Sequence, residues 1–262
     1  MLLKDKVVMV SGIGPGLGKE LALEAARQGA RLAVCARTAS KLDDCESELR
    51  AAGLDNPVLK VATDITAPAQ CQDFVAATLA AYGCIDCLIN SAYSPGVFTP
   101  IDRADLDGWR RAMEVNLFGS MNLTLAVVPG MKERRQGAIV MINTMVTRKP
   151  RATQGGYAAS KAALASATAH LALELGPHNI RVNSAFMGWM WGPPVQSYFE
   201  QMAKRGSGSI HGPRAEIEKT IPLGAIPDDA DCAKAAIFLA SDYARAITGA
   251  ALDVNGGEYL PH

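Results

Sequence analysis

The sequence predicts an α/β protein built on one doubly wound sheet of parallel strands. Short apolar segments alternate with longer helical segments along the 262 residues. These short segments are apolar throughout, which is typical of strands that are buried on both faces of a sheet. A glycine-rich segment follows the first strand and opens the first helix. We therefore expect seven parallel strands, helices on both faces, and ligands at the carboxyl ends of the strands.

Each expected element has a local signal. The first strand contains three valines, and Gly29 ends the first helix. Pro68 lies in the first turn of a later helix, where proline is tolerated. The expected strands are residues 6–11, 31–36, 58–62, 85–90, 138–143, 180–186 and 250–254. The expected helices are residues 16–28, 40–52, 67–82, 106–134, 157–175 and 230–240.

Composition argues against several classes of protein. The 26 basic and 26 acidic residues give zero net charge, whereas a general nucleic-acid binder would have a basic excess. No apolar run approaches the roughly 18 residues of a membrane span, and the first residues lack the apolar core of a secretory signal. We therefore expect a cytoplasmic protein without nucleic-acid or membrane partners. Its six cysteines are expected to be reduced thiols, and no metal site is expected.

No linker or repeat divides the chain, so a single domain is expected over residues 1–262. The segment at about 192–219 interrupts the alternation, because its prolines and glycines surround one short expected helix. Long insertions at the carboxyl end of a strand are often lids over a binding site. We expect a small substrate lid here, and the alternative is a surface excursion without function.

The glycine-rich segment Ser11–Gly18 (SGIGPGLG) predicts a dinucleotide site. Glycine allows a tight turn and lets a pyrophosphate approach the backbone. The free N–H groups and the positive dipole end of the following helix attract that anion. The residues expected to contact the cofactor here are Gly12, Gly14, Pro15, Gly16, Leu17 and Gly18.

The end of the second strand favours NADP over NAD. Sites that prefer NAD usually place an acidic residue here for the ribose 2′-hydroxyl, and Ala36 cannot serve in this way. Arg37 can hold a 2′-phosphate instead. The alternative is a solvated arginine that covers the adenine. Pro15 occupies the position in the glycine loop where a second basic residue often supports the phosphate.

Tyr157 and Lys161 are four residues apart in an expected helix and therefore share one face. A phenol titrates at about 10 in water, so it is a poor base at neutral pH. A neighbouring ammonium stabilises the phenolate, so we expect Lys161 and a cationic nicotinamide to lower the pKa of Tyr157. The alternative is an ordinary half-exposed helix face.

Several further motifs occur in the order that is found in one family. Asn90–Tyr93 stands where N-N-A-G is usual, and Ser11–Gly18 is similar to T-G-x-x-x-G-x-G. Other matching segments are Val115–Gly119, Tyr157–Lys161, Ile180–Asn183 and Asp253–Gly257. Over essentially its whole length the chain resembles the short-chain dehydrogenase/reductase family. The resemblance implies a single Rossmann domain and a homotetramer that pairs through the helices at 106–134 and 157–175.

The resemblance also implies roles for individual residues. Tyr157 is expected to be the general acid/base on the substrate oxygen, and Lys161 to lower its pKa and bind the nicotinamide ribose. Thr144 replaces the usual serine that polarises the carbonyl, and it keeps the hydroxyl donor. Asn116 is expected to hold a water that relays protons to Lys161. Further implied cofactor contacts are Asp64, Ile65, Asn90, Ser91, Ala92, Gly188 and Met190.

The departures from the family pattern gather on the substrate side. Tyr93 replaces a glycine, and Gly192 replaces a threonine that commonly touches the cofactor's carboxamide or phosphate. Trp189 and Trp191 are expected to wall an apolar pocket, and the alternative is core packing beneath the lid. The residues expected to contact the substrate are Tyr93, Met145, Gln154, Trp189, Trp191 and Tyr198.

These observations predict an NAD(P)-dependent oxidoreductase that moves a hydride between nicotinamide and a secondary alcohol or ketone. Aromatic residues at the expected cleft favour an apolar cyclic substrate, such as a steroid, a terpenoid or an aromatic-derived ketone. Two alternatives remain. One is reduction of 3-oxoacyl thioesters, and the other is a non-catalytic dinucleotide-binding sensor.

Overall fold

Strands and helices alternate as predicted in the computed structural model, which describes residues 1–205 and 211–261. The strands are β1 (Val7–Ser11), β2 (Arg31–Ala36), β3 (Val58–Ala62), β4 (Cys87–Asn90), β5 (Gly137–Thr144), β6 (Ile180–Met187) and β7 (Ala251–Val254). The helices are α1 (Leu17–Arg27), α2 (Ala39–Ala51), α3 (Pro68–Tyr82), α4 (Leu106–Met113), α5 (Ser120–Arg134), α6 (Gly155–Leu175), α7 (Pro193–Arg205), α8 (His211–Glu218) and α9 (Asp229–Ala240). Short helical turns are η1 (Ile101–Arg103), η2 (Glu114–Gly119), η3 (Met145–Thr147), η4 (Gly176–His178) and η5 (Asp242–Ala244).

The strands form one parallel sheet in the order β3-β2-β1-β4-β5-β6-β7, which confirms the predicted fold. The chain starts at β1, builds outward to β3, and then returns to place β4 on the other side of β1. Ser11 at the end of β1 is therefore level with both Cys35 and Asn90. This reversal opens a crevice at the carboxyl ends of β1 and β4, where ligands bind in doubly wound sheets.

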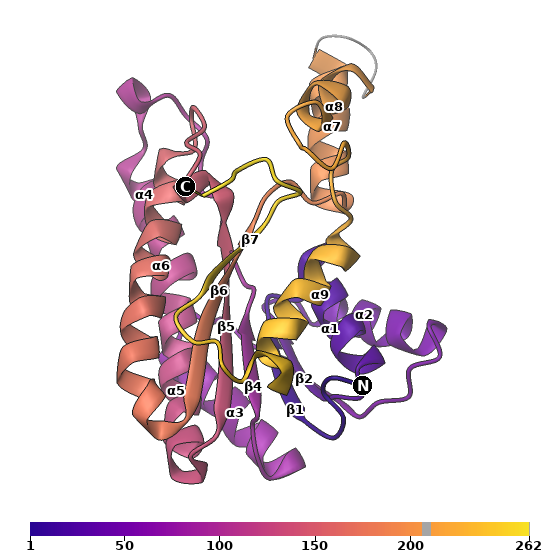
Figure 1. Ribbon diagram of the computed structural model, residues 1–262, viewed down its shortest axis with the longest axis vertical. Coiled ribbons are helices and arrows are strands. Elements are labelled where there is room, and N and C mark those ends of the chain that lie inside the picture. The colour runs from indigo at the N-terminus through magenta and orange to yellow at the C-terminus, as the bar shows by residue number, and fades with distance from the viewer. Residues whose placement is uncertain (206–210, 262) are drawn as a thin grey trace.

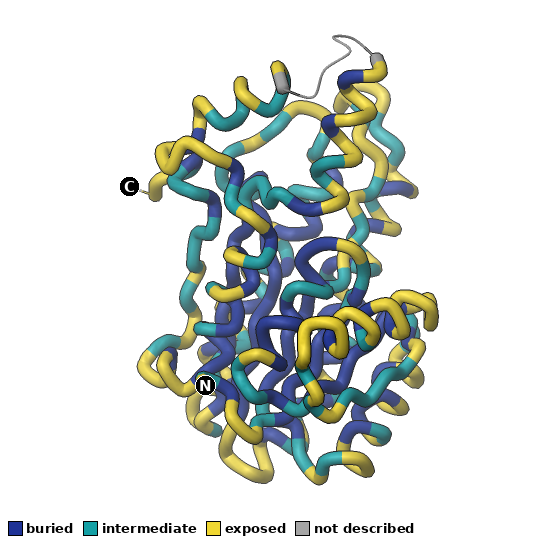
Figure 2. The backbone as a smooth tube through the Cα atoms, turned by 90° about the vertical axis from the view of Figure 1, so that its right-hand side faces the viewer, coloured by how far each residue is buried: buried dark blue, intermediate teal, exposed yellow. Residues whose placement is uncertain are grey.

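Helices cover both faces of the sheet (Figure 1). α1, α2 and α9 pack on one face through residues such as Leu21 and Ile237. α3, α5 and α6 pack on the other face through residues such as Phe74 and Leu164. The five inner strands consequently lie in the buried centre of the molecule, whereas the edge strands β3 and β7 are half-buried, and the exposed residues lie mainly on the outer helices and loops (Figure 2).

The long helix expected over residues 106–134 is interrupted. It consists of α4, the π-helical turn η2 and α5. A π turn adds about one residue to a helical turn without ending the helix, so the apolar pattern of the sequence does not reveal it. Such turns are frequent at functional sites. Here the turn contains Asn116, one of the predicted site residues.

The segment expected to form a lid with one short helix contains two helices, α7 and α8, beyond the carboxyl end of the sheet (Figure 1). Residues 206–210 of the predicted lid lie outside the described part of the chain. The segment returns to the domain beside Trp191, whose backbone N–H donates to the Pro227 carbonyl at 2.7 Å. Trp191 also forms an isolated parallel bridge with Asp228, just before α9.

Candidate active site

A cleft of about 530 Å³ lies at the carboxyl ends of the central strands, where the sheet order reverses. Its volume is in the range of small-molecule sites. The predicted site residues that line it are Gly12, Gly14, Pro15, Gly16, Leu17, Gly18, Arg37, Asp64, Ile65, Ser91, Ala92, Tyr93, Thr144, Tyr157, Lys161, Gly188 and Met190. Those placed outside its lining are Asn90, Asn116, Met145, Gln154, Trp189, Trp191 and Tyr198.

The glycine loop is shaped by close backbone contacts. A Cβ on Gly12 would collide with the backbone of Ala92, and one on Gly18 would collide with the Gly12 carbonyl. Gly16 has φ +97°, a conformation that side chains rarely adopt. Ser11 fixes the loop to the neighbouring strand, because its Oγ accepts the N–H of Ser91 at 3.2 Å. The loop thus has little freedom, and backbone N–H groups at the start of α1 are available to an anion.

The adenosine end of the cleft contains two cations. Arg37 and Lys41 both line it, and a Cβ on Gly14 would lie 3.9 Å from the Lys41 Nζ. Thr38 lines the same region, and its hydroxyl is not used to cap α2. Asp64 accepts hydrogen bonds from the N–H and hydroxyl of Thr66 at 3.0 and 2.8 Å, which together with Arg37 keep its pKa low.

Lys41 was missed by sequence reasoning, which looked for a second basic residue only within the glycine loop. The position of Lys41 in the sequence, four residues after Arg37, could have indicated that it reaches the cleft. The first turn of a helix that follows a strand lies at the carboxyl edge of the sheet. The Lys41 side chain lies over the glycine loop, because both its Cδ and its Nζ would be 3.9 Å from a Cβ on Gly14.

Three catalytic candidates converge where β5 meets α6. Lys161 is 2% exposed, and its Nζ donates to the Ile142 carbonyl at 2.7 Å. Thr144 lies two residues further along β5, and its hydroxyl hydrogen-bonds to Tyr157. The Tyr157 ring packs edge-on against Tyr93, with ring centroids 6.4 Å apart. Tyr157, Lys161 and Thr144 therefore face one cleft, as the four-residue spacing predicted for Tyr157 and Lys161 and as the family resemblance implied for Thr144.

The start of α6 is fixed by an aromatic contact that the sequence analysis did not anticipate. A Cβ on Gly156 would lie 2.6 Å from Trp109 Cδ1, so only glycine lets α6 approach the α4 indole this closely. A Cβ on Gly155 would lie 3.0 Å from Cζ2 of the same ring. Tyr157 follows directly, so this contact determines where its phenol lies.

The pKa values of the pair differ from our expectation. Burial raises the pKa of Tyr157 above its ordinary value, the neighbouring Tyr93 phenol raises it further, and the hydrogen bond from Thr144 opposes both effects. Burial also lowers the pKa of Lys161 to about 7. In the protein alone, Lys161 therefore does not make Tyr157 more acidic, because desolvation dominates for both groups.

Lys161 makes the stability of the protein depend on pH. Between pH about 7 and the ordinary lysine value of 10.5, the folded chain binds fewer protons than the unfolded chain. Stability therefore decreases as the pH falls through this window. We expect Lys161→Met to raise the melting temperature relative to wild type by several degrees more at pH 6.5 than at pH 9.5, since 1 kcal/mol corresponds to about 2–4 °C in a chain of this length.

Differential scanning calorimetry in matched buffers measures this change. The exposed Lys132→Met is the control and should show the same difference from wild type at both pH values. A melting-temperature difference for Lys161→Met that does not change with pH would contradict the assigned burial of a titrating amine.

Asn116 and Asn90 are buried beneath the cleft. The Asn116 amide donates to the Ser160 hydroxyl at 2.8 Å and to the Ser94 carbonyl at 2.9 Å, and its oxygen accepts the Ser94 N–H at 2.7 Å. Asn90 donates to the Thr124 hydroxyl at 3.0 Å. Asn116 therefore connects η2, the loop after β4 and α6, and its predicted role in a proton relay stays a prediction.

The predicted substrate residues divide into two groups. Tyr93 lines the cleft and is 53% exposed, whereas Met145 is buried. Trp189, Trp191 and Tyr198 surround the buried Phe199 of α7, with ring centroids 5.8, 6.0 and 5.6 Å from it. This cluster attaches α7 to the domain, in agreement with the core-packing alternative for the two tryptophans. Tyr198 remains 43% exposed.

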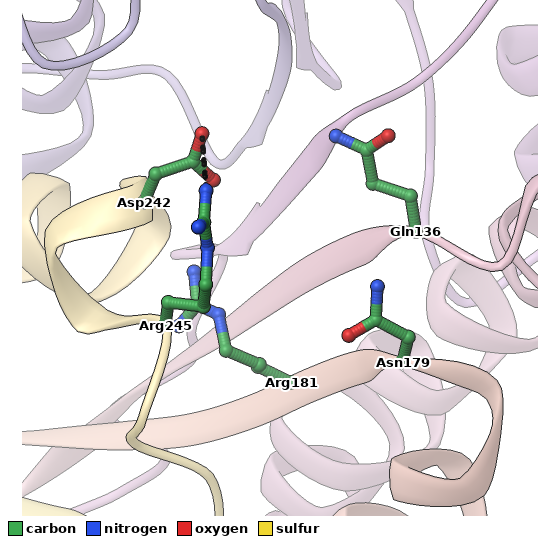
Figure 3. Close-up of a pocket in the computed structure, with 5 residues that line it drawn as sticks. All are labelled: Gln136, Asn179, Arg181, Asp242 and Arg245. Atoms are coloured by element: carbon green, nitrogen blue, oxygen red, sulfur yellow. Dashed lines mark ion pairs between the residues drawn. The ribbon is translucent and has the colours of Figure 1, made fainter.

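A second, polar pocket lies near the amino ends of β5 and β6, away from the cleft. It is lined by Gln136, Asn179, Arg181, Asp242 and Arg245. Figure 3 shows Arg245 paired with Asp242 on one side of this pocket and the two amides on the other. Among the described residues there is no cluster of three metal-ligating side chains. Nor does the described part of the chain include a helix long and apolar enough to cross a membrane.

Comparison with known proteins places this geometry among dehydrogenases. A family model described as short chain dehydrogenase matches residues 6–210. The chain is 32% identical over 267 residues to a trans-4-hydroxycyclohexanecarboxylate dehydrogenase of Sinomonas cyclohexanicum, covering 97% of this chain and 93% of the relative. It is 31% identical over 259 residues to a 3-oxoacyl-acyl-carrier-protein reductase of Thermotoga maritima, covering 98% and 99% of the two chains. An actinorhodin polyketide ketoreductase variant, solved with NADPH, has a TM-score of 0.88 and 30% identity over 97% of each chain.

Proposed function

Because this chain belongs to the short-chain dehydrogenase family, we propose that it is an NADP-dependent oxidoreductase acting on an apolar cyclic secondary alcohol or ketone. The observation that carries this proposal is the convergence of Tyr157, Lys161 and Thr144 in the cleft that also contains the glycine loop. An acid/base phenol beside a dinucleotide site is the arrangement that carbonyl reduction requires.

The cleft fits a nicotinamide dinucleotide. Gly12 and Gly18 bring the turn close to the start of α1, and Gly14 leaves the loop surface open for a diphosphate. When bound, the dinucleotide supplies the hydride that is exchanged with the substrate carbon. The protein's contribution is to bind, orient and polarise the reactants.

The chain's own groups favour proton donation to a carbonyl oxygen. The raised pKa keeps Tyr157 protonated at neutral pH, so its phenol can donate to the oxygen that becomes an alcohol. The Thr144 hydroxyl, which lines the same cleft, can polarise that oxygen. Lys161, with a pKa of about 7, can give and take a proton near neutral pH and can return one to Tyr157.

The charges at the adenosine end support NADP. Ala36 offers no acceptor for a ribose hydroxyl, whereas Arg37 and Lys41 line the cleft with two positive charges. Thr38 adds a hydroxyl donor to this group. A 2′-phosphate would therefore have two cationic partners, and an unphosphorylated ribose would leave both cations unused.

The substrate end supports a cyclic substrate of moderate size. Tyr93 presents an exposed aromatic ring beside Tyr157, and a flat ring can stack against it. The similar enzyme from Sinomonas cyclohexanicum is named for a cyclohexane acid. An apolar wall on one side of the phenol therefore favours cyclic ketones over small polar ones.

Reduction of 3-oxoacyl thioesters is the second candidate, because one relative is named for that reaction. A carrier protein would need free basic residues near the cleft. The cations after β5 are already paired, since Lys149 and Arg151 contact Glu258 at 3.2 and 2.6 Å and Arg148 contacts Asp253 at 2.5 Å. This internal pairing makes carrier-protein docking the weaker candidate.

A spectrophotometric panel tests the proposed function. NADPH and NADH oxidation should be followed in parallel with cyclohexanones, steroid and bicyclic terpenoid ketones, and acetoacetyl thioesters. We expect the highest kcat/KM with NADPH and a cyclic ketone, at least tenfold above any thioester. Higher kcat/KM with thioesters would favour the second candidate, and cofactor binding without any turnover would favour a sensor.

A further inference from the structure

Asp229, in the first turn of α9, places a buried carboxylate in the wall of the cofactor cleft. It is 9% exposed, and it lines the cleft together with Gly16 and Gly192. A Cβ on Gly16 would lie 3.6 Å from the Asp229 Oδ2, and a Cβ on Gly192 would collide with the same oxygen. This oxygen therefore lies between the glycine loop and the segment that follows β6.

The surrounding backbone holds the carboxylate in this position. Asp228, which precedes it, forms a parallel bridge with Trp191, and Pro227 accepts the Trp191 N–H at 2.7 Å. These contacts place Asp229 beside Gly192. Because any side chain at position 192 would collide with it, the carboxylate occupies the space that such a side chain would fill.

Among the residues whose side chains the structure describes, 1–204 and 212–261, no cation forms an ion pair with Asp229. Lys19 is the described cation whose charge acts on it, but the Lys19 ammonium is 2.8 Å from Glu48. Burial and the charge of Asp228 raise the pKa of Asp229, while backbone N–H groups of its own helix turn and the charge of Lys19 oppose that shift. A buried carboxylate in this setting is stabilised by a further N–H or O–H donor.

The chemistry of a dinucleotide limits what this donor can be. Its phosphates carry no donor and are repelled by a carboxylate. The adenine amine belongs at the opposite end of the cleft, beyond Arg37 and Lys41. The hydroxyls of the nicotinamide ribose are expected to face Lys161, so the donor left for Asp229 is the carboxamide NH₂ of the nicotinamide. Asp229 lines the same cleft as Gly188 and Met190, and its Oδ2 lies beside Gly192, which follows β6.

We propose that Asp229 binds the carboxamide NH₂ of the nicotinamide ring, in place of the side chain that Gly192 lacks. This proposal rests on the proposed dinucleotide function. It assigns Asp229 a role in orienting the nicotinamide ring, because a hydrogen bond to the carboxamide fixes the rotation of the ring and therefore the face that meets the substrate.

Binding to cofactor analogues tests the assignment without measuring turnover. Isothermal titration calorimetry should compare NADP⁺ with its 3-acetylpyridine analogue, in which a methyl group replaces the carboxamide NH₂, and with 2′-phospho-ADP-ribose, which has no nicotinamide. For Asp229→Ala we expect about tenfold or greater weakening for NADP⁺, as for a lost hydrogen bond to a charged group. We expect less than threefold weakening for the other two ligands. Asp229→Asn retains an acceptor oxygen and should lose less affinity for NADP⁺ than Asp229→Ala.

Equal weakening for all three ligands would overturn the assignment and would indicate that Asp229 only supports the glycine loop. Tighter binding of all three would also overturn it, because Asp229 would then act only by repelling the phosphates. If the wild-type protein binds neither NADP⁺ nor NAD⁺, the proposed function itself fails. That outcome is distinct from a wild type that binds normally and a variant that does not discriminate between the ligands.

A pair of substitutions at the same place gives a second test. Gly192→Thr alone should weaken NADP⁺ binding at least tenfold, because its Cβ collides with the Asp229 carboxylate. In Gly192→Thr/Asp229→Ala the threonine hydroxyl can occupy the vacated space, so we expect at least fivefold tighter binding than in either single variant. Additive losses in the double variant would contradict a shared site.

Discussion

We expect Tyr157→Phe to lose at least about a thousandfold in kcat, within the range of general acid–base contributions, while its NADP⁺ dissociation constant changes less than twofold. The substitution removes one hydroxyl and keeps the ring that packs against Tyr93. Stopped assays with excess enzyme measure the residual turnover, and calorimetry measures cofactor binding. The Thr144 hydroxyl, which now lacks its phenol partner, cannot replace the acid, because its own pKa is far too high.

Tyr243→Phe is the matched control, since this tyrosine is 77% exposed and lies outside the cleft lining. It should keep wild-type kcat within a factor of two. A Tyr157→Phe enzyme that retains more than a tenth of the wild-type kcat would refute the acid/base role. A simultaneous loss of NADP⁺ binding would instead indicate that the substitution disturbs α6, whose first turn depends on the contact with Trp109.

The second large effect is expected at the adenosine end. Arg37→Ala/Lys41→Ala should raise the KM for NADPH about a hundredfold and the KM for NADH less than threefold, because two charge-assisted hydrogen bonds to the 2′-phosphate are lost. Each single variant should raise the KM for NADPH about tenfold. Initial rates at saturating ketone, with NADPH or NADH as the varied cofactor, measure the KM of the wild type and of each variant.

Arg50→Ala is the control on the same helix, because Arg50 is exposed and pairs only with Glu46 among the described residues. It should leave both KM values unchanged. The wild-type preference for NADPH should also decrease at high salt, since Arg37 and Lys41 are accessible to solvent. Equal increases in KM for NADH and NADPH in the double variant would refute recognition of the 2′-phosphate by these two cations.

The order of the elements and the position of the Tyr157–Lys161 pair could be predicted because both depend on local sequence. Continuous apolar runs indicate buried parallel strands, and the four-residue spacing of Tyr157 and Lys161 places both on one face of a helix. The glycine loop could be predicted equally well, since its position after β1 and before α1 follows from the order of the elements along the chain. These features need no knowledge of what packs against them.

The residues that escaped prediction depend on contacts between distant segments. Lys41 reaches the cleft only because α2 returns over the sheet edge near Gly14. Asn116 lies in the π turn and forms hydrogen bonds with Ser94 and Ser160, which belong to other segments of the chain. The two tryptophans that were expected to wall an apolar pocket pack on Phe199 of α7, a residue whose burial no periodicity revealed.

The sequence by itself determined the parallel sheet, the dinucleotide turn and the Tyr157–Lys161 face, since each is specified by residues that are neighbours along the chain or along a helix. Only the tertiary structure decided the electrostatics of the site. Burial depends on every segment that surrounds a group, so only the folded chain could show that the pKa of Tyr157 is raised and that of Lys161 lowered. The same holds for Asp229, which is 37 residues from Gly192 in sequence and fills the space beside it in the fold.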